Sequence, residues 1–324
     1  MIAPESVMPA NPKFVLSIDP QTPPPELMGA VVAIGNFDGV HRGHRVVIAR
    51  AMTLARRLGR PCAVLTFEPH PVDFFGRGGG IFRLTSRDAK AHRMAELGLD
   101  GMFVLTFDEA LARLDAERFL RDVLIRRIGA GAVVVGYDFH FGAGRSGTPA
   151  FLREAAPKLG IQVEIVEKVF ADEEGSLEAV SSTATREALE RGDIRGAAAL
   201  LGHAWSLTGK VIHGAKLGRQ LGFPTANLAV EASCRLRHAI YAVEVDLDGR
   251  RLKGVASFGR RPTVDDGPPL LEVYLFDFTG DIYDRDIEVF FVDFLRPEKK
   301  FESLQTLTAQ IREDEMQARR ILNS

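Results

Sequence analysis

Alternation between short apolar runs and helix-periodic segments, from Ala30 to about Leu201, constrains the fold of this 324-residue chain most strongly. A short apolar run followed by apolar residues at helical spacing is typical of a strand and then a helix. Repeated alternation of this kind builds βαβ units and therefore a parallel sheet with helices on its faces. The predicted strands are Gly29–Ile34, Cys62–Phe67, Gly101–Leu105, Ala132–Gly136 and Val163–Val166, and the predicted helices include Arg45–Leu58, Asp88–Leu97 and Ala116–Ile128.

The pattern changes after about His203, where runs rich in aromatic and branched residues are separated by Asp-Gly, Asp-Asp-Gly and Thr-Gly-Asp turns. Such runs predict antiparallel strands and together favour a small closed barrel. A closing apolar stripe predicts a helix over Ser303–Leu322, and we interpret its charge run at Arg312–Glu315 as a solvated face. The fold class is therefore α/β with a second, antiparallel β domain, divided as residues 1–200 and 201–324. The predicted barrel strands are Tyr241–Asp246, Leu252–Ser257, Leu271–Phe276 and Ile287–Val292.

Charge and cysteine content argue against several classes of function. The 41 basic and 43 acidic residues nearly cancel, so the net charge gives no reason to expect binding to nucleic acid or to an anionic membrane. Two cysteines far apart in the sequence make no disulfide framework and are typical of a reducing compartment. The first residues lack the basic and apolar segments of a signal peptide, and no apolar run reaches the length of a membrane span. We therefore expect a cytoplasmic protein that binds neither nucleic acid nor membrane.

The turn after the first long apolar strand carries His41 and His44, where a helix is expected to begin. The start of a helix presents unpaired backbone N–H groups and about half a positive charge, which together stabilise a bound anion. Residues three apart on a helix share a face, so both imidazoles can point at one phosphate. Gly43 leaves room for that phosphate to approach the backbone. The turn is therefore predicted to bind phosphate.

A metal site is the main alternative for a histidine pair. A structural zinc would need further nitrogen or sulfur ligands. Cys62 has no other potential metal ligand near it in the sequence. Cys234 and His238 are two potential ligands without further ones nearby, and they lie in the other half of the chain. The dinucleotide fingerprint G-x-G-x-x-G is also missing after this strand. These observations favour phosphate handling over metal or dinucleotide binding.

Two later segments of the first half carry polar groups. Thr66–Pro71 contains two prolines and one histidine after a predicted strand, and its local pattern favours a plain turn. Ser182, Thr183 and Arg186 precede a helix expected from about Glu187, where hydroxyls and a guanidinium can bind a second phosphate. A plain N-cap remains the commoner explanation of the hydroxyls alone.

The second half opens with Gly209–Asn227, a glycine-rich loop with several cations that ends in Pro-Thr-Ala-Asn. Glycines let successive backbone N–H groups converge on a phosphate. The loop lacks the Walker sequence, and a flexible hairpin would explain its glycines but not its polar ending.

Alternation in a later predicted strand places Leu271, Val273 and Leu275 on one face and Glu272 with Tyr274 on the other. A carboxylate is uncommon in the middle of a strand. The pattern alone leaves a surface salt bridge and a functional carboxylate equally open.

Three segments of the first half resemble bacterial FAD synthetases, a branch of the nucleotidylyltransferase superfamily. They are Gly35–His44, which resembles the first signature, Gly136–Gly142, which resembles a flavin or nucleotide segment, and Val180–Arg186, which resembles the second signature. The resemblance implies a Rossmann-like nucleotidylyltransferase domain. It implies that Gly35, Phe37, Asp38, Gly43, Asp138, Ser182 and Thr183 bind nucleotide or flavin, and that His41, His44 and Arg186 act on the phosphates. His140 and Thr185 depart from the residues usual at their positions.

Four segments of the second half resemble bacterial riboflavin kinases. Gly218–Asn227 matches that family's signature at every fixed position, and Gly254–Thr263, Leu271–Phe278 and Phe294–Phe301 follow in the family's order. The resemblance implies that Thr225 and Asn227 coordinate Mg²⁺ with ATP and that Glu272 is the general base. It implies nucleotide or flavin contacts for Gly214, Gly218, Arg219, Gly222, Arg296 and Glu298. Ser257 and Tyr274 stand where Asn and His are common.

The two resemblances together imply a bifunctional enzyme of flavin cofactor synthesis. The β-barrel would make FMN from riboflavin and ATP, and the α/β domain would convert FMN and ATP to FAD and pyrophosphate. Mg²⁺ is the implied cofactor, and flavin-dependent apoproteins are candidate acceptors of FAD. One alternative is an enzyme with a single activity, FMN adenylylation, whose kinase domain is impaired by the departures at Ser257 and Tyr274. Another is a non-catalytic flavin sensor, although a binder has no need of a base at Glu272.

Overall fold

The computed structural model describes residues 13–76, 80–167, 180–213, 218, 221–259 and 269–323. These residues form two compact units. The first comprises the described residues of Met1–Ile81 and Ser86–Val180, and the second those of Phe82–Thr85 and Ser181–Ser324. The two compact units therefore divide between Val180 and Ser181. The boundary of the functional domains at residue 200 stays a prediction.

A six-stranded parallel sheet forms the centre of the first unit, in the order β1-β4-β3-β2-β5-β6. The predicted parallel sheet is confirmed. The central strand β2 (Val31–Ile34) is wholly apolar, and its side chains are at most 3% exposed, because helices cover both faces of the sheet. The other strands are β1 (Val15–Ile18), β3 (Cys62–Glu68), β4 (Gly101–Thr106), β5 (Ala132–Gly136) and β6 (Gln162–Val166). The edge strand β1 was not predicted from the sequence.

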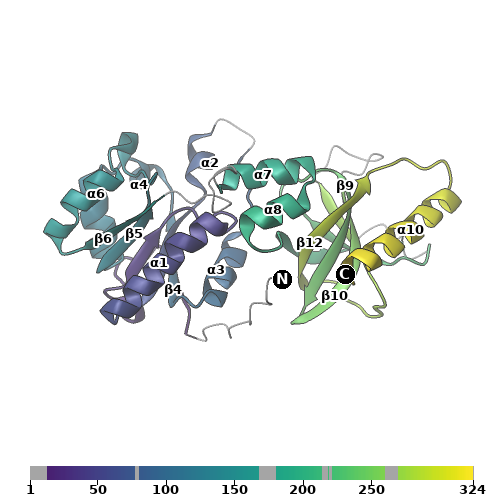
Figure 1. Cartoon of the computed structure of the whole chain (residues 1–324), viewed down its shortest axis with the longest axis horizontal. Helices are drawn as coiled ribbons and strands as arrows, with labels where there is room; N and C mark the ends of the chain where they lie inside the picture. The colour runs from purple at the N-terminus through teal and green to yellow at the C-terminus, as the bar shows by residue number, and fades with distance from the viewer. Residues whose placement is uncertain are drawn as a thin grey trace. The chain divides into compact units, whose positions relative to one another are not determined.

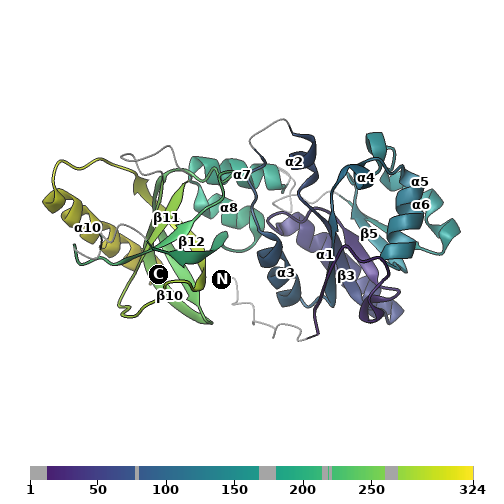
Figure 2. The same ribbon diagram turned by 180° about the vertical axis from the view of Figure 1, so that it is seen from behind.

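Two layers of helices cover this sheet (Figures 1 and 2). One layer contains α1 (Arg42–Leu58) and α3 (Arg87–Glu96), whose apolar residues share a core with one face of the sheet. The other face packs against α5 (Ala116–Arg118), the π-helical segment Phe119–Arg127 and α6 (Pro149–Ala155). The helix predicted over Ala116–Ile128 is continuous, and its hydrogen bonding changes from α-helical to π-helical after Arg118. Shorter helices are α2 (Pro71–Phe75) and α4 (Glu109–Ala112), with single 3₁₀ turns at Pro25–Leu27, Ala143–Arg145 and Pro157–Leu159.

A closed antiparallel barrel forms the centre of the second unit, in the order β10-β11-β8-β7-β12-β9, which confirms the predicted barrel. Large side chains fill its interior, among them Trp205, Tyr241, Phe258 and Phe291. Sequence analysis identified four of its strands and missed the two that flank the glycine-rich loop. The strands are β7 (Ser206–Ile212), β8 (Thr225–Ala229), β9 (Ala239–Leu247), β10 (Arg250–Gly259), β11 (Leu270–Leu275) and β12 (Asp286–Pro297).

Three helices complete the second unit. α7 (Ser182–Arg191) and α8 (Ile194–Leu201) pack with the barrel core, and α10 (Leu304–Leu322) lies along its outer surface (Figure 1). The interpretation of the charge run on α10 as a solvated face was wrong for Asp314. That carboxylate is buried because a guanidinium from β12 binds it.

Candidate active sites

The predicted phosphate turn of the first unit lies between β2 and α1. The helix begins at Arg42, earlier than predicted, with His41 as its N-cap, and Nδ1 of His41 accepts a hydrogen bond from the His44 backbone N–H at 3.3 Å. The two imidazole rings stack with centroids 3.6 Å apart and an interplanar angle of 17°. A Cβ on Gly43 would lie 3.2 Å from the His41 ring, so a larger residue there would press on the stacked pair. The predicted histidine pair is therefore brought together at a helix N-terminus.

The backbone of this turn is unusual because three of its residues have positive φ. Phe37, Gly39 and Val40 have φ of 49°, 81° and 42°. Left-handed backbone is unfavourable for residues with a Cβ, above all for a β-branched residue such as Val40. Phe37 is buried, packs edge-on against the His44 ring at 5.2 Å, and lies 3.3 Å from where a Cβ on Gly35 would be. Phe37 therefore supports the histidines, and Asp38 beside it is also buried.

Two other predicted segments lie at the ends of strands next to β2. Asp138 is exposed and follows β5, the strand that pairs with β2. Its backbone carbonyl oxygen lies 2.8 Å from Nδ1 of His140, which donates a hydrogen bond to it when that nitrogen carries the proton. His70 follows β3, the neighbour on the other side, and its Nδ1 accepts from the Val72 N–H at 3.2 Å as the N-cap of α2. Because the sheet is parallel, both segments lie at the same carboxyl edge as the His41 turn.

The second predicted anion segment belongs to the start of α7, in the second unit. The helix begins at Ser182 rather than near Glu187, because Ser181 is the N-cap and its Oγ accepts from the Ala184 N–H at 3.1 Å. Ser182 and Thr183 therefore lie in the first turn. Thr185, which departs from the residue usual at its position, is fully buried, and its hydroxyl donates a hydrogen bond to the Ser181 carbonyl.

Arg186 lies one turn further along α7 and is 8% exposed. Its Nε donates to the backbone carbonyl of Phe82 at 2.7 Å. Phe82 is itself held in the second unit by an edge-on contact with Trp205, whose Nε1 donates to the Leu84 carbonyl at 2.9 Å. The orientation of the Arg186 guanidinium is thus fixed by a segment about a hundred residues away in the sequence.

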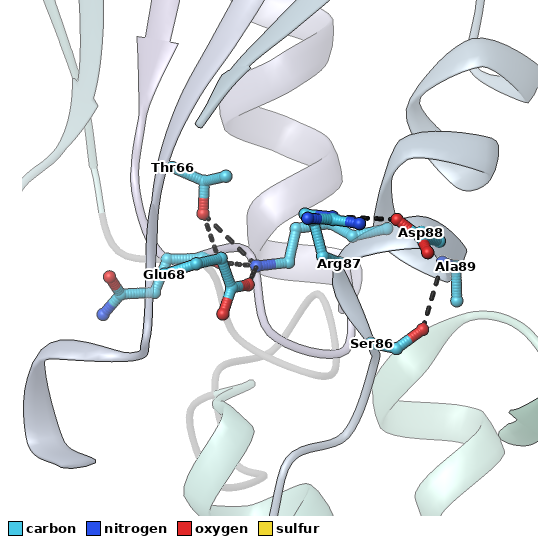
Figure 3. Close-up of polar contacts among 8 residues, drawn as sticks. Thr66, Glu68, Ser86, Arg87, Asp88 and Ala89 are labelled. Carbon is cyan, nitrogen blue, oxygen red and sulfur yellow. Dashed lines mark hydrogen bonds and ion pairs between the residues drawn. The ribbon is translucent and has the colours of Figure 1, made fainter. Parts of the chain in front are cut away.

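Sequence analysis missed a buried lysine beside the His41 turn. Lys90 on α3 is 1% exposed, and its Nζ donates to the Asn36 carbonyl at 2.9 Å, to Thr66 Oγ1 at 3.3 Å and to Glu68 Oε1 at 3.1 Å (Figure 3). Thr66 Oγ1 also donates to the Asn36 carbonyl, at 3.0 Å. The available signal was a lysine on the apolar stripe of an amphipathic helix, since Met94 one turn later is fully buried.

The candidate kinase site lies on the outer face of the barrel. Asn227 on β8 is directly opposite Glu272 on β11, and Glu272 is directly opposite Ser257 on β10. Directly paired residues project from the same face of a sheet, so these three side chains form a row across three strands. The predicted alternation on β11 is confirmed, because Leu271, Val273 and Leu275 are buried in the barrel core and Glu272 is half-buried.

The two predicted metal ligands both lie on β8, and one of them, Asn227, belongs to this row. Asn227 is 5% exposed, and among the described residues its Oδ1 has no hydrogen-bond partner. A buried carbonyl oxygen without a partner is unfavourable, and Mg²⁺ prefers ligands of this kind. Thr225, two residues earlier, is half-buried and pairs with Tyr274. The residues present therefore fit a Mg²⁺ ion.

The glycine loop is described in part. Gly222 has φ of 88°, and a Cβ on Gly218 would lie 2.4 Å from the Phe223 carbonyl and 3.4 Å from Thr225 Oγ1. Both positions therefore need glycine beside a predicted metal ligand. Gly214 and Arg219 lie outside the described residues.

Glu298 contributes a second carboxylate near the outer face of the barrel. A Cβ on Gly259, at the end of β10, would lie 2.0 Å from Glu298 Oε1, so the carboxylate lies against that backbone. His238 Nδ1 is 3.9 Å from Glu298 Oε2. Burial raises the pKa of Glu298, and the charge of Glu272 raises this pKa further, against the opposing effects of His238 and Arg296. The charge of Glu272 therefore acts on Glu298.

Arg296 is bound to α10. Its Nε and Nη2 each donate to the Asp314 carboxylate at 2.7 Å, and its Nη1 donates to the Pro297 carbonyl at 3.0 Å. Asp314 is 2% exposed. A second pairing, between Arg319 and Asp277, ties the same helix to the residues that follow β11. Contact of Arg296 with a flavin stays a prediction.

Comparison with known protein families matches both halves of the chain. A family model described as FAD synthetase matches residues 24–184, and a model described as riboflavin kinase matches residues 201–322. Within the part of the chain that the structure describes, no helix is long and apolar enough to cross a membrane.

Curated relatives cover nearly the whole chain. The bifunctional riboflavin kinase/FMN adenylyltransferase of Escherichia coli K12 is 40% identical over 292 residues, which is 90% of this chain and 92% of that protein. The protein of the same description from Pseudomonas fluorescens is 43% identical over 296 residues, 91% of this chain and 94% of that protein. A crystal structure from Streptococcus pneumoniae, described as a macrolide-efflux protein, matches with a TM-score of 0.81 at 29% identity, over 95% of this chain and 99% of that one.

Proposed function

The chain belongs to the bifunctional riboflavin kinase/FMN adenylyltransferase family, and we propose that each half of the chain carries one of the two reactions. The C-terminal half phosphorylates riboflavin with ATP to give FMN. The N-terminal half transfers the adenylyl group of ATP to FMN, which gives FAD and pyrophosphate. Support for this division comes from a candidate phosphate site in each unit, the stacked His41 and His44 in the first and the Asn227–Glu272 pair in the second.

In adenylylation, a phosphate oxygen of FMN forms a bond to the α-phosphorus of ATP while the bond from that phosphorus to pyrophosphate breaks. Negative charge increases on the oxygens around the α-phosphorus and on the leaving pyrophosphate. We assign His41 and His44 to the α- and β-phosphate oxygens, because their rings lie at the N-terminus of the 17-residue helix α1, where the helix dipole favours anions. No side-chain nucleophile is required.

Other residues of the first reaction have supporting roles in the proposal. Arg186 binds the β/γ end of the triphosphate, and the Ser182 and Thr183 hydroxyls donate to the same phosphates. The guanidinium is suited to this because its Nε is already fixed by the Phe82 carbonyl. The exposed carboxylate of Asp138 binds flavin or nucleotide at the edge of the sheet. Gly35, Phe37, Asp38 and Gly43 shape the turn that holds the histidines.

In the kinase reaction, Glu272 takes the proton of the ribityl 5′-hydroxyl as the hydroxyl oxygen forms a bond to the γ-phosphorus of ATP and the bond from that phosphorus to the leaving ADP breaks. Asn227 and Thr225 hold Mg²⁺, and the buried Asn227 Oδ1, which has no partner among the described residues, supports this. Mg²⁺ supplies charge neutralisation at the phosphates. Ser257, which stands where the family commonly has Asn, belongs to the same cross-strand row.

The remaining predicted residues of the kinase surround this row in the proposal. Gly214, Gly218, Arg219 and Gly222 form the loop that binds the phosphates of ATP. Glu298 accepts a hydrogen bond from the flavin. Arg296 contacts the flavin or nucleotide in the proposal, and its pairing with Asp314 fixes the orientation of its guanidinium. Flavin-dependent apoproteins are the proposed acceptors of the FAD produced.

The test supplies the purified full chain with riboflavin and Mg²⁺-ATP and follows FMN and FAD separately by chromatography. Both products are expected, with FMN appearing first and FAD forming also from added FMN. Formation of FAD from FMN without any phosphorylation of riboflavin would support the single-activity alternative. Binding of flavin without turnover of ATP would support the non-catalytic sensor.

A further inference from the structure

Lys90 joins three groups that belong to two different strand ends. Its ammonium group has three N–H donors, and among the described residues its acceptors include the Asn36 carbonyl, Thr66 Oγ1 and Glu68 Oε1. Asn36 begins the turn after β2, whereas Thr66 and Glu68 lie on the last residues of β3. Figure 3 shows Thr66 and Glu68 at the end of their strand beside the first turn of α3.

The start of α3 is itself fixed. Ser86 Oγ accepts from the Ala89 N–H at 3.2 Å, and Arg87 Nε donates to Asp88 at 2.8 Å (Figure 3). Lys90 therefore extends from a capped helix end that is held in one place. A charged side chain is seldom buried to this degree without an ionic partner, which Glu68 provides at 3.1 Å.

The backbone that Lys90 holds is the strained turn. Asn36 directly precedes Phe37, and the positive φ angles of Phe37 and Val40 each cost about 1–2 kcal/mol for a residue with a Cβ. Strained backbone persists only where its surroundings hold it in place, and such strain is often found at functional sites. The Asn36 carbonyl accepts from both Lys90 and Thr66, which uses both of its lone pairs.

We propose that Lys90 is a positioning residue for adenylyl transfer, which sets the His41–His44 pair by holding the Asn36 carbonyl against the end of β3. It touches no substrate. The inference rests on the proposed adenylyltransferase function of the first half. The competing explanation is that Lys90 only neutralises the Glu68 charge in a buried place, and the two explanations differ in what happens when both charges are removed.

The experiment compares the full chain with Lys90→Met, with Lys90→Met/Glu68→Gln and with a control, Lys158→Met, whose partner Glu154 is in an exposed pair. Each protein is assayed for kcat and KM of FAD formation from FMN and Mg²⁺-ATP, for FMN formation from riboflavin, and for thermal unfolding by circular dichroism. Riboflavin phosphorylation reports whether the preparation is folded and active at a site that Lys90 does not serve.

Lys90→Met is expected to lower kcat for FAD formation about a hundredfold, since small displacements of reacting groups have effects of this size, with a smaller change in the KM for ATP. Lys158→Met is expected to match the wild type. The double variant is expected to regain thermal stability, because no unpaired charge is left, while its kcat for FAD formation stays low.

Recovery of wild-type kcat in the double variant would overturn the positioning role and leave only charge neutralisation. A folded Lys90→Met protein with wild-type kcat would overturn it as well. If Lys90→Met does not fold, the double variant decides alone. Absence of FAD formation in the wild type would instead contradict the proposed function.

Discussion

Asn227 and Glu272 are directly paired across the ladder between β8 and β11, with Asn227 5% exposed and Glu272 half-buried on the same outer face of the barrel. Side chains paired in this way have their Cβ atoms about 4.5–5.5 Å apart. A metal ion bound by Asn227 would therefore lie close to the carboxylate that is proposed to take the proton. The proposed reaction requires this, because the hydroxyl that Glu272 deprotonates attacks a phosphate of the ATP that the metal ion would bind.

Replacement of Glu272 by Gln should abolish the kinase reaction alone. The substitution keeps the shape of the side chain and removes the base, so we expect kcat for FMN formation to fall by about a hundredfold or more. FAD formation from added FMN should persist at the wild-type rate. Separate assays of the two reactions on one preparation test this, and loss of both activities from a folded protein would contradict the division of labour.

Replacement of Asn227 by Ala should raise the Mg²⁺ concentration that half-saturates the kinase. Even an outer-sphere partner of a metal is worth about tenfold in affinity, so loss of a direct ligand should cost at least about tenfold. Asn227→Asp retains a hard oxygen and should keep Mg²⁺ binding. Titration of FMN formation with Mg²⁺ measures both, and an unchanged requirement in Asn227→Ala would show that this oxygen is no ligand.

Joint replacement of His41 and His44 by Ala should abolish FAD formation and spare the kinase. Loss of one donor to developing charge commonly lowers kcat by about a hundredfold to a thousandfold, and here both donors are lost. FMN should then accumulate when riboflavin and Mg²⁺-ATP are supplied. Time courses of the two flavins check the result, and continued FAD synthesis would refute the assignment to the phosphates.

Local pattern predicted the fold well where burial and periodicity agree. β2 and β5 are central strands covered on both faces, so their apolar runs are unambiguous. The Glu272 alternation was also readable, because one face of β11 packs on the barrel core. By contrast β1 is a four-residue edge strand whose exposed positions are the apolar Leu16 and Ile18, so its sequence does not alternate between apolar and polar residues as a half-buried strand does.

Contacts distant in sequence could not be read from local pattern. Asp314 lies in a charge run on a helix, and only its pairing with Arg296 on β12 explains its burial. The sequence does not distinguish Lys90 from the other lysines, because its hydrogen-bond partners follow β2 and end β3, far from it in the sequence. The periodicity of the sequence predicted the helices that carry Asp314 and Lys90. The burial of these two charges depends on partners that only the tertiary structure brings to them.

The thiols of Cys62 and Cys234 should resist alkylation in the folded protein. Burial raises the pKa of Cys62 to about 12 and that of Cys234 to about 11, so at pH 8 almost no thiolate is present. Because the folded pKa values lie above the ordinary value of 9.0, both thiols favour the folded state below that pH and lose this contribution as pH rises towards 12. Mass spectrometry after treatment with iodoacetamide should find neither cysteine labelled at pH 8 and both labelled in concentrated guanidinium. Rapid labelling of Cys62 in the native protein would contradict its burial, and rapid labelling of the half-buried Cys234 would contradict its raised pKa.

Loss of the Asp314 carboxylate should destabilise the second unit far more than loss of an exposed one. Asp314→Asn leaves the guanidinium of Arg296, with 19% side-chain exposure, without its charge partner, and breaking a buried pair in this way costs about 3–5 kcal/mol. Asp277→Asn is the matched control, because its pair with Arg319 is largely exposed and solvent and salt screen such pairs, so its loss should change the stability little. Trp205, the single tryptophan of the chain, is buried in the barrel core, so its fluorescence during urea unfolding reports on this unit.

Arg296→Met/Asp314→Leu should recover most of the lost free energy of unfolding, since apolar groups of similar size replace the pair. Equal effects of the two single variants would show that the Arg296–Asp314 pair does not hold α10 on the barrel.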